Sequence, residues 1–526
     1  MDGIELALLE RRTGAICEEM GVVLRRTAFS PNIKDRLDFS CALFDPDGAL
    51  FAQAAHIPVH LGSMAYAMAE VVAEIDWRPG DVVMFNDPYL GGTHLPDVTV
   101  VMPAFSGERL VGFAANRAHH ADIGAAQPGS MPLSRTLEEE GIVIPPLLLL
   151  RDGQVPDAAA LILARLARDP DFDRAGPDAW QRRPELADFA AQLASARVGA
   201  ARTLALAERM GALTFAAGIA ALNDYAERLA GEAIALIPDG RWTARDWLDG
   251  DGLGTEDVVI EVALTVSGRE VEVNFAGTAD QVAGNLNCPL SVAAAAVFYV
   301  FRCLMPAQTP ASAGAFRPVR IEAAPGSLLN ARRPAAVAAG NVETSMRVVD
   351  VLLKALAPAL PECIPAAAQG TMNNVAMGAR GGNGSWDYYE TIAGGTGGHA
   401  RGAGMSAVHA HMTNTLNTPI ESLEAHYPLR VLRYAERRGS GGAGAAAGGD
   451  GVIREYVFLS KAEVSLLGER RQHAPWGLHG GGDGRPARDY RNGELLPGKA
   501  SFTMAAGDVL TIETPGGGGY GAPGSG

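Results

Sequence analysis

The spacing of apolar residues changes twice along this chain, and this change limits the fold more than any other feature. Apolar residues at helical spacing open the chain between Met1 and Ser30 and stop at Ser30-Pro31, where proline disfavours a preceding helix. Strand-like segments follow, SCALFDPDGALFA at 40–52 and three more between residues 81 and 116. The first part of the chain is therefore predicted to mix helices and strands.

A long helical segment separates this part from a second strand-rich part. Residues 158–237 are rich in Ala, Leu, Arg and Glu, and 186–237 are predicted to form one or two long helices. Strand-like alternation returns after Trp242 and again from Tyr456 onward. We predict an α+β, multi-domain fold with an N-terminal domain over 1–240, closed by the helical segment, and a strand-rich C-terminal domain over 241–526.

Charge and cysteine usage narrow the class of protein. The 60 acidic and 44 basic residues give a net charge of -16, and the basic residues are scattered, so no nucleic-acid partner is expected. The N-terminus lacks the apolar core of a signal peptide, and the apolar stretches 142–150 and 292–301 are too short to span a bilayer. The five cysteines are well separated. These features predict a reduced, cytoplasmic protein without membrane segments or structural zinc on thiolates.

Side chains that bind divalent metals are concentrated between Asn86 and Asp122. Imidazole nitrogen and carboxylate oxygen suit zinc, manganese or iron, and an ion held by them lowers the pKa of water towards neutrality. The glycines Gly91 and Gly92 predict a tight turn that presents two of these side chains from one loop. A turn or capping role for each is the alternative, because no compact signature such as HExxH is present. The candidates in this window are Asp87, His94, Asp97, His119, His120 and Asp122.

Other polar residues are candidates for lining a pocket. His56 and His60 flank Pro58, which favours a loop, and we interpret both histidines as pocket-lining, with a structural role as the alternative. Amides and carboxylates also gather near 370–374 and 409–424 and could bind the amide edges of a polar cyclic ligand, or act in turns and caps. The substrate-binding candidates from this second cluster are Asn373, Asn374 and His411.

Glycine-rich segments and missing motifs bear on nucleotide binding. Residues 439–451 and 516–526 are either flexible segments or a binding loop built from backbone. No GxxxxGK[ST] phosphate-binding loop and no GxSxG nucleophile motif is present. Nucleotide binding is therefore not expected from this chain.

Nine ordered motifs make the sequence similar to the hydantoinase B family, which includes N-methylhydantoinase B subunits, the B-like half of ATP-dependent oxoprolinase, caprolactam-hydrolysing subunits and, more distantly, acetone and acetophenone carboxylases. The similarity runs nearly end to end. Two segments depart from it: relatives usually carry an arginine within the segment matching 439–451, and residues 166–185 diverge. The motifs are NIKDRLDFSCALFD, HIPVHLGSM, FNDPYLGGTHLPD, NRAHHADIG, GNLNCPL, GNVETS, QGTMNN, NTPIESLE and TPGGGGYG.

The resemblance implies a ligand set and a mechanism. The aspartate of DFS, the histidine and aspartate of THLPD and the second histidine of the HH pair correspond to Asp38, His94, Asp97 and His120. From strand alternation alone, only one of His119 and His120 is expected to face the metal. One divalent ion would then activate water, with His119 or Asp122 orienting a ligand or moving a proton.

The resemblance also implies a partner. An A-type chain would bind ATP and phosphorylate the carbonyl oxygen of a cyclic amide, and this chain, the B-type subunit, would open the ring, in a heterotetramer of two A and two B chains. Two alternatives remain at this point, a subunit of an acetone- or acetophenone-type carboxylase and a non-catalytic structural subunit. The ring that is opened and the identity of the metal do not follow from the motifs.

Overall fold

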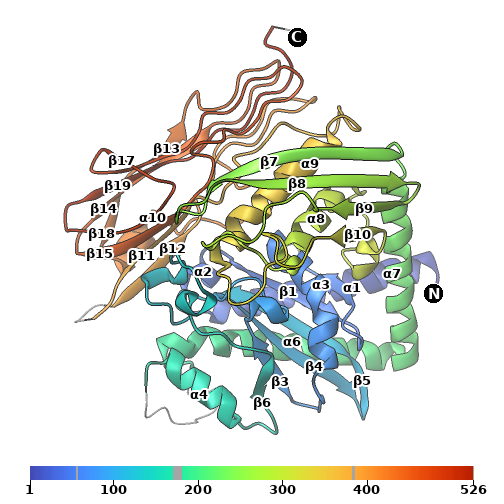
Figure 1. Cartoon of the computed structure of the whole chain (residues 1–526). Coiled ribbons are helices and arrows are strands. Elements are labelled where there is room, and N and C mark those ends of the chain that lie inside the picture. The colour runs from blue at the N-terminus through green and yellow to red at the C-terminus, as the bar shows by residue number, and fades with distance from the viewer. Residues whose placement is uncertain (55–56, 170–179, 382–384, 525–526) are drawn as a thin grey trace.

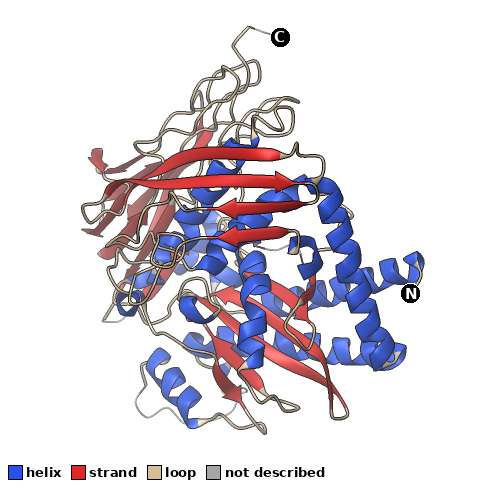
Figure 2. Ribbon diagram, turned by 45° about the vertical axis from the view of Figure 1, so that its right-hand side comes forward, coloured by secondary structure: helices blue, strands red, loops and turns tan. Residues whose placement is uncertain are grey.

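The chain folds into an α+β structure, as the sequence predicts, and the strands of its described residues form four sheets (Figures 1 and 2). The computed structural model describes residues 1–54, 57–169, 180–381 and 385–524. The predicted division at residue 240 stays a prediction. The largest buried apolar cluster nevertheless draws residues from both sides of it, among them Val59 and Val349.

The N-terminal part is built on a six-stranded sheet in which every neighbouring pair is antiparallel, in the order β2-β1-β5-β4-β3-β6. Helices α1 (Gly3–Thr27) and α6 (Pro184–Met210) pack on one face of this sheet, and α3 (Pro58–Ala73) packs on the other. Both faces are therefore buried. The strands are β1 (Phe39–Phe44), β2 (Leu50–Gln53), β3 (Val82–Phe85), β4 (Asp97–Ser106), β5 (Arg109–His119) and β6 (Leu147–Leu150).

The helices follow from local sequence signals. A capping box between Asp2 and Glu5 opens α1 and satisfies its first backbone N–H groups. The predicted 186–237 segment forms α6 and α7 (Ala212–Ile234), which are separated by Gly211 in the left-handed region (φ +81°). Among the described residues no single helix is long and apolar enough to cross a membrane, whereas α6 and α7, bent by 106°, pass that test only as a pair.

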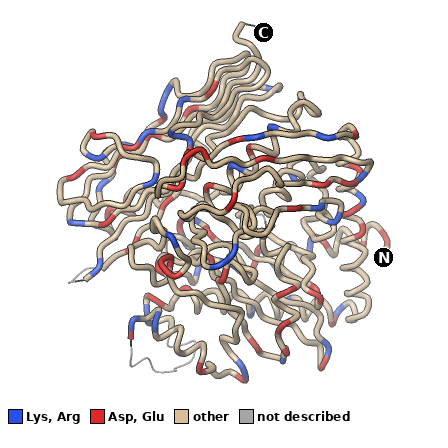
Figure 3. The backbone as a smooth tube through the Cα atoms, viewed as in Figure 1, with Lys and Arg blue, Asp and Glu red and all other residues tan. Residues whose placement is uncertain are grey.

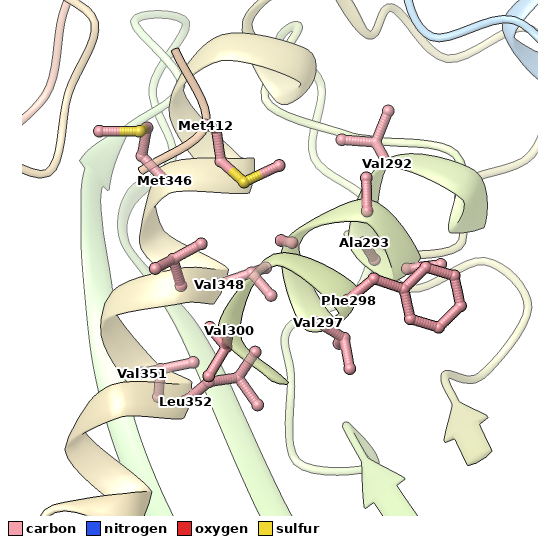
Figure 4. Packing of buried hydrophobic residues seen from close by; sticks show 14 of the residues in the cluster. Val292, Ala293, Val297, Phe298, Val300, Met346, Val348, Val351, Leu352 and Met412 are labelled. Carbon is pink, nitrogen blue, oxygen red and sulfur yellow. The ribbon is translucent and has the colours of Figure 1, made fainter. Parts of the chain in front are cut away.

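A second sheet, in the order β10-β9-β8-β7, lies across the upper part of the molecule in Figure 2, with helices between it and the first sheet. Helix α8 (Leu290–Leu304) packs against α3 and against α9 (Ser345–Leu356), which in turn contacts β7 and β8. Figure 4 shows Val300 facing Val351 and Leu352 of α9, while Phe298 points away from that helix. The strands of this sheet are β7 (Gly240–Gly250), β8 (Glu256–Ser267), β9 (Glu270–Asn274) and β10 (Val319–Glu322).

Two antiparallel sheets form the C-terminal part, and their facing sides share one buried apolar cluster. Their orders are β12-β11-β15-β18 and β13-β14-β19-β16-β17. Acidic and basic residues are interspersed along the chain in both parts (Figure 3). The strands are β11 (Asn374–Ala379), β12 (Trp386–Glu390), β13 (Leu429–Arg437), β14 (Gly451–Phe458), β15 (Ala462–Leu467), β16 (Arg488–Arg491), β17 (Glu494–Leu496), β18 (Lys499–Met504) and β19 (Val509–Glu513).

The shorter helical segments connect these layers. They are α2 (Pro31–Lys34), α4 (Asp157–Leu166) and α10 (Ile420–His426), with single turns η1 (Pro88–Leu90), η2 (Pro128–Ser130), η3 (Leu137–Glu140), η4 (Ala313–Phe316) and η5 (Gly340–Thr344).

The glycine-rich segments form a layered bundle of extended chains, drawn in orange and red near the C-terminus in Figure 1. Their backbones hydrogen-bond directly to one another, as in Gly517 N–H to the Gly449 carbonyl and Gly442 N–H to the Gly517 carbonyl. A Cβ added at Gly517 would stand 2.0 Å from the Thr396 carbonyl oxygen. Interpreting residues 439–451 as a flexible loop is therefore wrong, because glycine there serves close backbone packing.

Candidate metal centre

Asp97, the first residue of β4, is the centre of a buried cluster of polar side chains. Its Oδ1 lies 3.1 Å from His94 Nε2 and 3.1 Å from His119 Nδ1, and its Oδ2 lies 3.1 Å from His60 Nε2. The Thr93 hydroxyl donates a 2.7 Å hydrogen bond to Oδ2. Three imidazoles thus surround one carboxylate that is fully buried.

The loop before β4 brings His94 and Asp97 together, as the sequence predicts. Gly91 ends the turn η1 in the left-handed region (φ +97°), and a Cβ on Gly92 would stand 2.3 Å from the Asn86 carbonyl oxygen. The buried Arg117 guanidinium fixes this loop by donating to the Gly91 carbonyl. Both glycines are therefore required by geometry.

Strand alternation at the end of β5 sends the two adjacent histidines to opposite faces of the sheet. His119 points to the face covered by α3 and enters the cluster. His120 points to the face covered by α6, where its Nε2 pairs with Gln192 Oε1 at 2.9 Å and its ring lies 4.4 Å from that of Phe189. The structure therefore places His119 in the cluster, and the expected ligand His120 lies outside it because neighbours on a strand face opposite sides.

The first turn of α3 and the start of β1 complete the N-terminal side. Pro58 occupies the first position of α3, where a missing N–H costs nothing, so the predicted loop at this point is wrong and His60 lies on a helix. His60 Nε2 is also 4.0 Å from Asp38 Oδ1. Asp38 lies 3.7 Å from the buried Arg36 guanidinium, which donates to the Tyr389 carbonyl.

The C-terminal half supplies the remaining wall. Asn341 Nδ2 lies 3.3 Å from Asp97 Oδ2, and the Tyr389 ring stacks on His119 with 4.7 Å between centroids. Asn341 belongs to η5, a π-helical turn, and π-helical turns are often found at functional sites. A Cβ on Gly340 would stand 1.9 Å from the Asn287 carbonyl oxygen, so this turn can form only with glycine there.

The donors in this cluster fit a divalent cation. His94, Asp97 and His119 each offer one ligand atom, and these three atoms lie within 4.8 Å of one another. His94 Nδ1 contacts the Ala338 carbonyl at 3.3 Å, which assigns a proton to Nδ1 and leaves Nε2 as the nitrogen that faces the cluster. Neither His94 Nε2 nor His119 Nε2 has a hydrogen-bond partner among the described residues, although His94 Nε2 lies 3.1 Å from Asp97 Oδ1. The cavity between them is about 20 Å³, enough for one ion or water molecule.

The pKa shifts of Asp97 and of the histidines around it also favour a cation site. Burial would raise the pKa of Asp97, but the charges of His94 and His60 outweigh it and hold this pKa well below its ordinary value. Burial would lower the pKa of His94, but Asp97 outweighs it and raises this pKa, so a cation bound here would replace a proton at His94 Nε2. Burial lowers the pKa of His119, so its imidazole is neutral and can act as a ligand. A fixed carboxylate beside a neutral imidazole is a donor set for zinc, manganese or iron.

The remaining predicted site residues lie around this cavity or away from it. Asn374 donates to Glu343 and accepts from the Tyr389 hydroxyl at 2.7 Å, so it supports a wall residue. Asn373 bonds Gln369 and Arg471, and His411 contacts the Tyr299 hydroxyl at 3.4 Å. Asp122 pairs with Arg168 and Arg380 outside the cavity. His56 lies outside the described residues.

Four residues of the site were missed by the sequence reasoning as functional candidates: Thr93, Asn341, Tyr389 and Arg36. Thr93 adjoins His94 and Asn341 lies within GNVETS, so both residues belong to motifs that the sequence reveals, but the motifs alone assign neither residue a role. Arg36 lies in the segment NIKDRLDFSCALFD and carried no signal of its own beside Asp38. Nothing local points to Tyr389, because its contact with His119 joins strands of different sheets.

Comparison with known proteins adds a family to this geometry. The model of the family described as Hydantoinase B/oxoprolinase matches residues 2–523. The chain is 37% identical to 5-oxoprolinase 1 of Arabidopsis thaliana over 99% of its own length, which spans 42% of that protein. It is 33% identical to a Pseudomonas sp. protein named as the B chain of a D-/L-hydantoinase, over 97% of this chain and 88% of that one.

Solved structures agree with these relatives. The ATP-dependent caprolactamase from Pseudomonas jessenii superposes with a TM-score of 0.89 at 27% identity, over 99% of this chain and 91% of that chain. The nucleotide-free structure of an acetone carboxylase superposes with a TM-score of 0.84 at 17% identity, over 99% and 76%, which shows a shared fold alone. Given a family match from one end to the other and relatives above 30% identity, this chain belongs to the Hydantoinase B/oxoprolinase family.

Proposed function

We propose that this chain is the B-type, hydrolytic subunit of an ATP-dependent enzyme that opens a cyclic amide. The observation that carries the proposal is the buried cluster of Asp97, His94 and His119. His94 Nε2 and His119 Nδ1 each lie 3.1 Å from Asp97 Oδ1, and His94 Nε2 and His119 Nε2 have no hydrogen-bond partner among the described residues. The names of the relatives, 5-oxoprolinase, hydantoinase and caprolactamase, supply the substrate class.

In this proposal His94, Asp97 and His119 hold one divalent ion, with Asp38 at the edge of the same cavity. Such an ion would supply Lewis acidity that makes water a nucleophile near neutral pH. Thr93 and Asn341 fix the orientation of the Asp97 carboxylate through its Oδ2, and Tyr389 fixes the plane of the His119 ring.

His60 is the residue best placed to move a proton. Its Nε2 stands between Asp97 Oδ2 and Asp38 Oδ1, and its Nδ1 contacts the Ser40 hydroxyl at 3.4 Å. An imidazole between two carboxylates can take a proton from water and return it to the leaving nitrogen. We therefore assign proton transfer to His60, while the roles of His119 and Asp122 expected from the sequence stay predictions.

The energetics of amide hydrolysis explain why ATP and a second protein chain are part of the proposal. Resonance makes the amide carbonyl a poor electrophile and nitrogen a poor leaving group, and phosphorylation of the oxygen relieves both. No phosphate-binding loop motif occurs in this sequence, so we assign ATP binding and phosphorylation to an A-type partner. Because the phosphorylated ring would hydrolyse in bulk water, we expect a tight cytoplasmic complex with an internal passage, built from two A and two B chains.

The test is reconstitution of the chain with its A-type partner and a panel of rings containing a hydantoin, 5-oxoproline and caprolactam. We expect ATP-dependent formation of a ring-opened acid, which Asp97→Asn abolishes while the complex still assembles. Turnover by this chain alone, or full activity of Asp97→Asn, would contradict the mechanism. Full activity of that variant would instead favour a structural subunit, and a product carrying carbon from labelled bicarbonate would indicate a carboxylase.

A further inference from the structure

Glu140 is a fully buried carboxylate that lies outside the lining of the metal cavity. It is the last residue of the turn η3. Its oxygens accept hydrogen bonds from the Ser134 hydroxyl at 2.7 Å and from the backbone N–H groups of Val337 and Ala338 at 3.0 and 2.9 Å. A buried carboxylate is costly unless donors of this kind surround it, and these three donors fit its ionised form. Glu140 thus fixes the backbone at Val337 and Ala338.

The backbone that Glu140 holds begins the helix that forms one wall of the metal cavity. Ala338 and Ala339 are helical and continue directly into η5 and α9. The N–H groups at the start of a helix have no partner within it, so a carboxylate at this end satisfies them and interacts favourably with the helix dipole. One turn further on, Asn341 donates to Asp97 Oδ2. Glu140 therefore anchors the turn that orients the Asp97 carboxylate.

The same residue, Ala338, also contacts a histidine of the cluster. Its N–H donates to Glu140, while its carbonyl oxygen lies 3.3 Å from His94 Nδ1. In a metal-binding histidine, the hydrogen bond made by one ring nitrogen fixes the direction of the other nitrogen. A displacement of Ala338 would therefore turn the His94 ring and shift Asn341 together.

Asn86 ties the loop that carries His94 to the segment that carries Glu140. Its side-chain amide donates to the Leu95 carbonyl at 2.8 Å and to the Ile142 carbonyl at 3.0 Å. Leu95 follows His94 directly, and Ile142 lies just beyond Glu140. The contacts through Asn86, Glu140 and Ala338 thus form a closed ring around His94, in which Glu140 supplies the link to the helix.

We propose that Glu140 is a positioning residue of the metal centre. It holds Ala338, and through Ala338 it sets the direction of the His94 imidazole. It also holds the turn from which Asn341 orients the Asp97 carboxylate. The inference rests on the function proposed above and adds to it a residue that acts on the cation only through other groups.

The affinity of the full-length chain for Zn²⁺, measured by competition with a chelating dye, tests the proposal. Burial raises the pKa of Glu140 to about 7, so the titration is run at about pH 8, where the carboxylate is ionised. Glu140→Ala should bind zinc about 10–100-fold more weakly than the unaltered chain, because the Ala338 N–H loses its acceptor. Glu140→Gln should restore most of this affinity, since its amide oxygen can accept from the same N–H groups.

Asp81 provides a matched control for a general loss of stability. Its carboxylate is equally buried and accepts three hydrogen bonds, from the Arg78 N–H and from the Arg151 guanidinium. Neither donor lines the metal cavity. Asp81→Ala should therefore lower the melting temperature, as Glu140→Ala does, but change zinc affinity by no more than about twofold.

The geometry of the bound ion gives a second measurement. The visible absorption of bound Co²⁺ depends on the arrangement of its ligands, so it should change in Glu140→Ala and not in Asp81→Ala. Equal losses of zinc affinity in the two alanine variants would overturn the inference. Zinc binding by Glu140→Gln as weak as that of Glu140→Ala would also overturn it, because the acceptor at this position would then have no role.

Crystal structures of the metal-free variants separate this inference from the proposed function. Suppose that the unaltered chain binds no metal and opens no ring, but the His94 ring turns in Glu140→Ala and keeps its place in Glu140→Gln. The positioning role then stands and the hydrolytic function fails. If instead the reconstituted complex opens a ring, while Glu140→Ala keeps both its zinc affinity and the orientation of His94, the positioning role fails and the function stands.

Discussion

Adjacent histidines on one strand offer a matched pair of variants that tests the metal centre. His119 and His120 are both buried, and they point to opposite faces of the same sheet. Replacing each by alanine removes the same atoms, but only His119→Ala removes a ligand. Metal binding should therefore separate two variants that any general loss of stability would affect alike.

The magnitudes follow from the contacts of each ring. Structural zinc sites contribute roughly 10–16 kcal/mol over about four ligands, so losing His119 should cost about 3 kcal/mol of metal affinity, or more than about 100-fold. His120→Ala removes the ring nitrogen that lies 2.9 Å from Gln192 Oε1, and it opens a gap beside Phe189. Leaving Gln192 Oε1 without its donor should lower the free energy of unfolding by about 1–3 kcal/mol. It should lower the melting temperature without lowering metal content.

The assay is metal content by mass spectrometry after dialysis against a competing chelator, together with melting temperature with and without added metal. We expect His119→Ala to lose its metal and the metal-dependent rise in melting temperature. His120→Ala should keep its metal and the same rise, although its melting temperature without metal is lower than that of the unaltered chain. Loss of metal from His120→Ala with retention by His119→Ala would refute the assignment of faces, and with it the cavity as the metal site.

Four further predictions concern the surroundings of the site. Burial raises the pKa of Glu343 to about 8, so between about pH 4.5 and 8 the folded chain holds a proton that the unfolded chain has lost. Stability should then fall as pH rises through this window, by at most ~1.4 kcal/mol per pH unit, and an equally steep melting curve against pH for Glu343→Gln would contradict this origin. Gly340→Ala should destabilise the chain by more than about 2 kcal/mol, because its Cβ would meet the Asn287 carbonyl oxygen at 1.9 Å; an unchanged melting temperature would refute the packing. Tyr389→Phe should lower the free energy of unfolding by about 1–3 kcal/mol, because it leaves Asn374 Oδ1 without its donor. Denaturant titration would measure this loss, and the metal content of the variant should not change. Removing the metal with a chelator should lower the melting temperature, with full recovery on adding one equivalent back, and indifference to chelator would argue against a metal.

Periodicity was sufficient for the fold class and for most elements. The opening helix, the strands flanking Asp45 and the helical segment that forms α6 and α7 follow from apolar spacing and turn residues, whereas the sequence left open whether that segment is one helix or two. The arrangement of four sheets does not follow, because it depends on pairings such as β5 beside β1, whose partners are far apart in sequence. The glycine bundle was missed for a related reason, since its order comes from backbones of distant segments.

The candidate site divides in the same way. His94 and Asp97 are joined by a local turn, so their spacing was informative. Alternation along β5 predicts that only one of His119 and His120 reaches the cluster, but choosing between them requires knowing which face of the sheet α3 covers. That fact is set by the packing of α3 on the sheet and not by the residues of the HH pair.

The cost of burying this cluster is itself an argument for a ligand. Asp97 and three imidazoles occupy a space where apolar side chains of similar size would stabilise the fold at least as well. Thr93 and Asn341 donate to one oxygen of the carboxylate, while the other oxygen faces His94 and His119. His60 Nε2 also lies 3.1 Å from the first oxygen, so neighbouring side chains hold both oxygens in place. Because these side chains come from separate segments of the chain, a cation bound among them would stabilise the assembled fold rather than any single loop, so removing the cation should lower global stability.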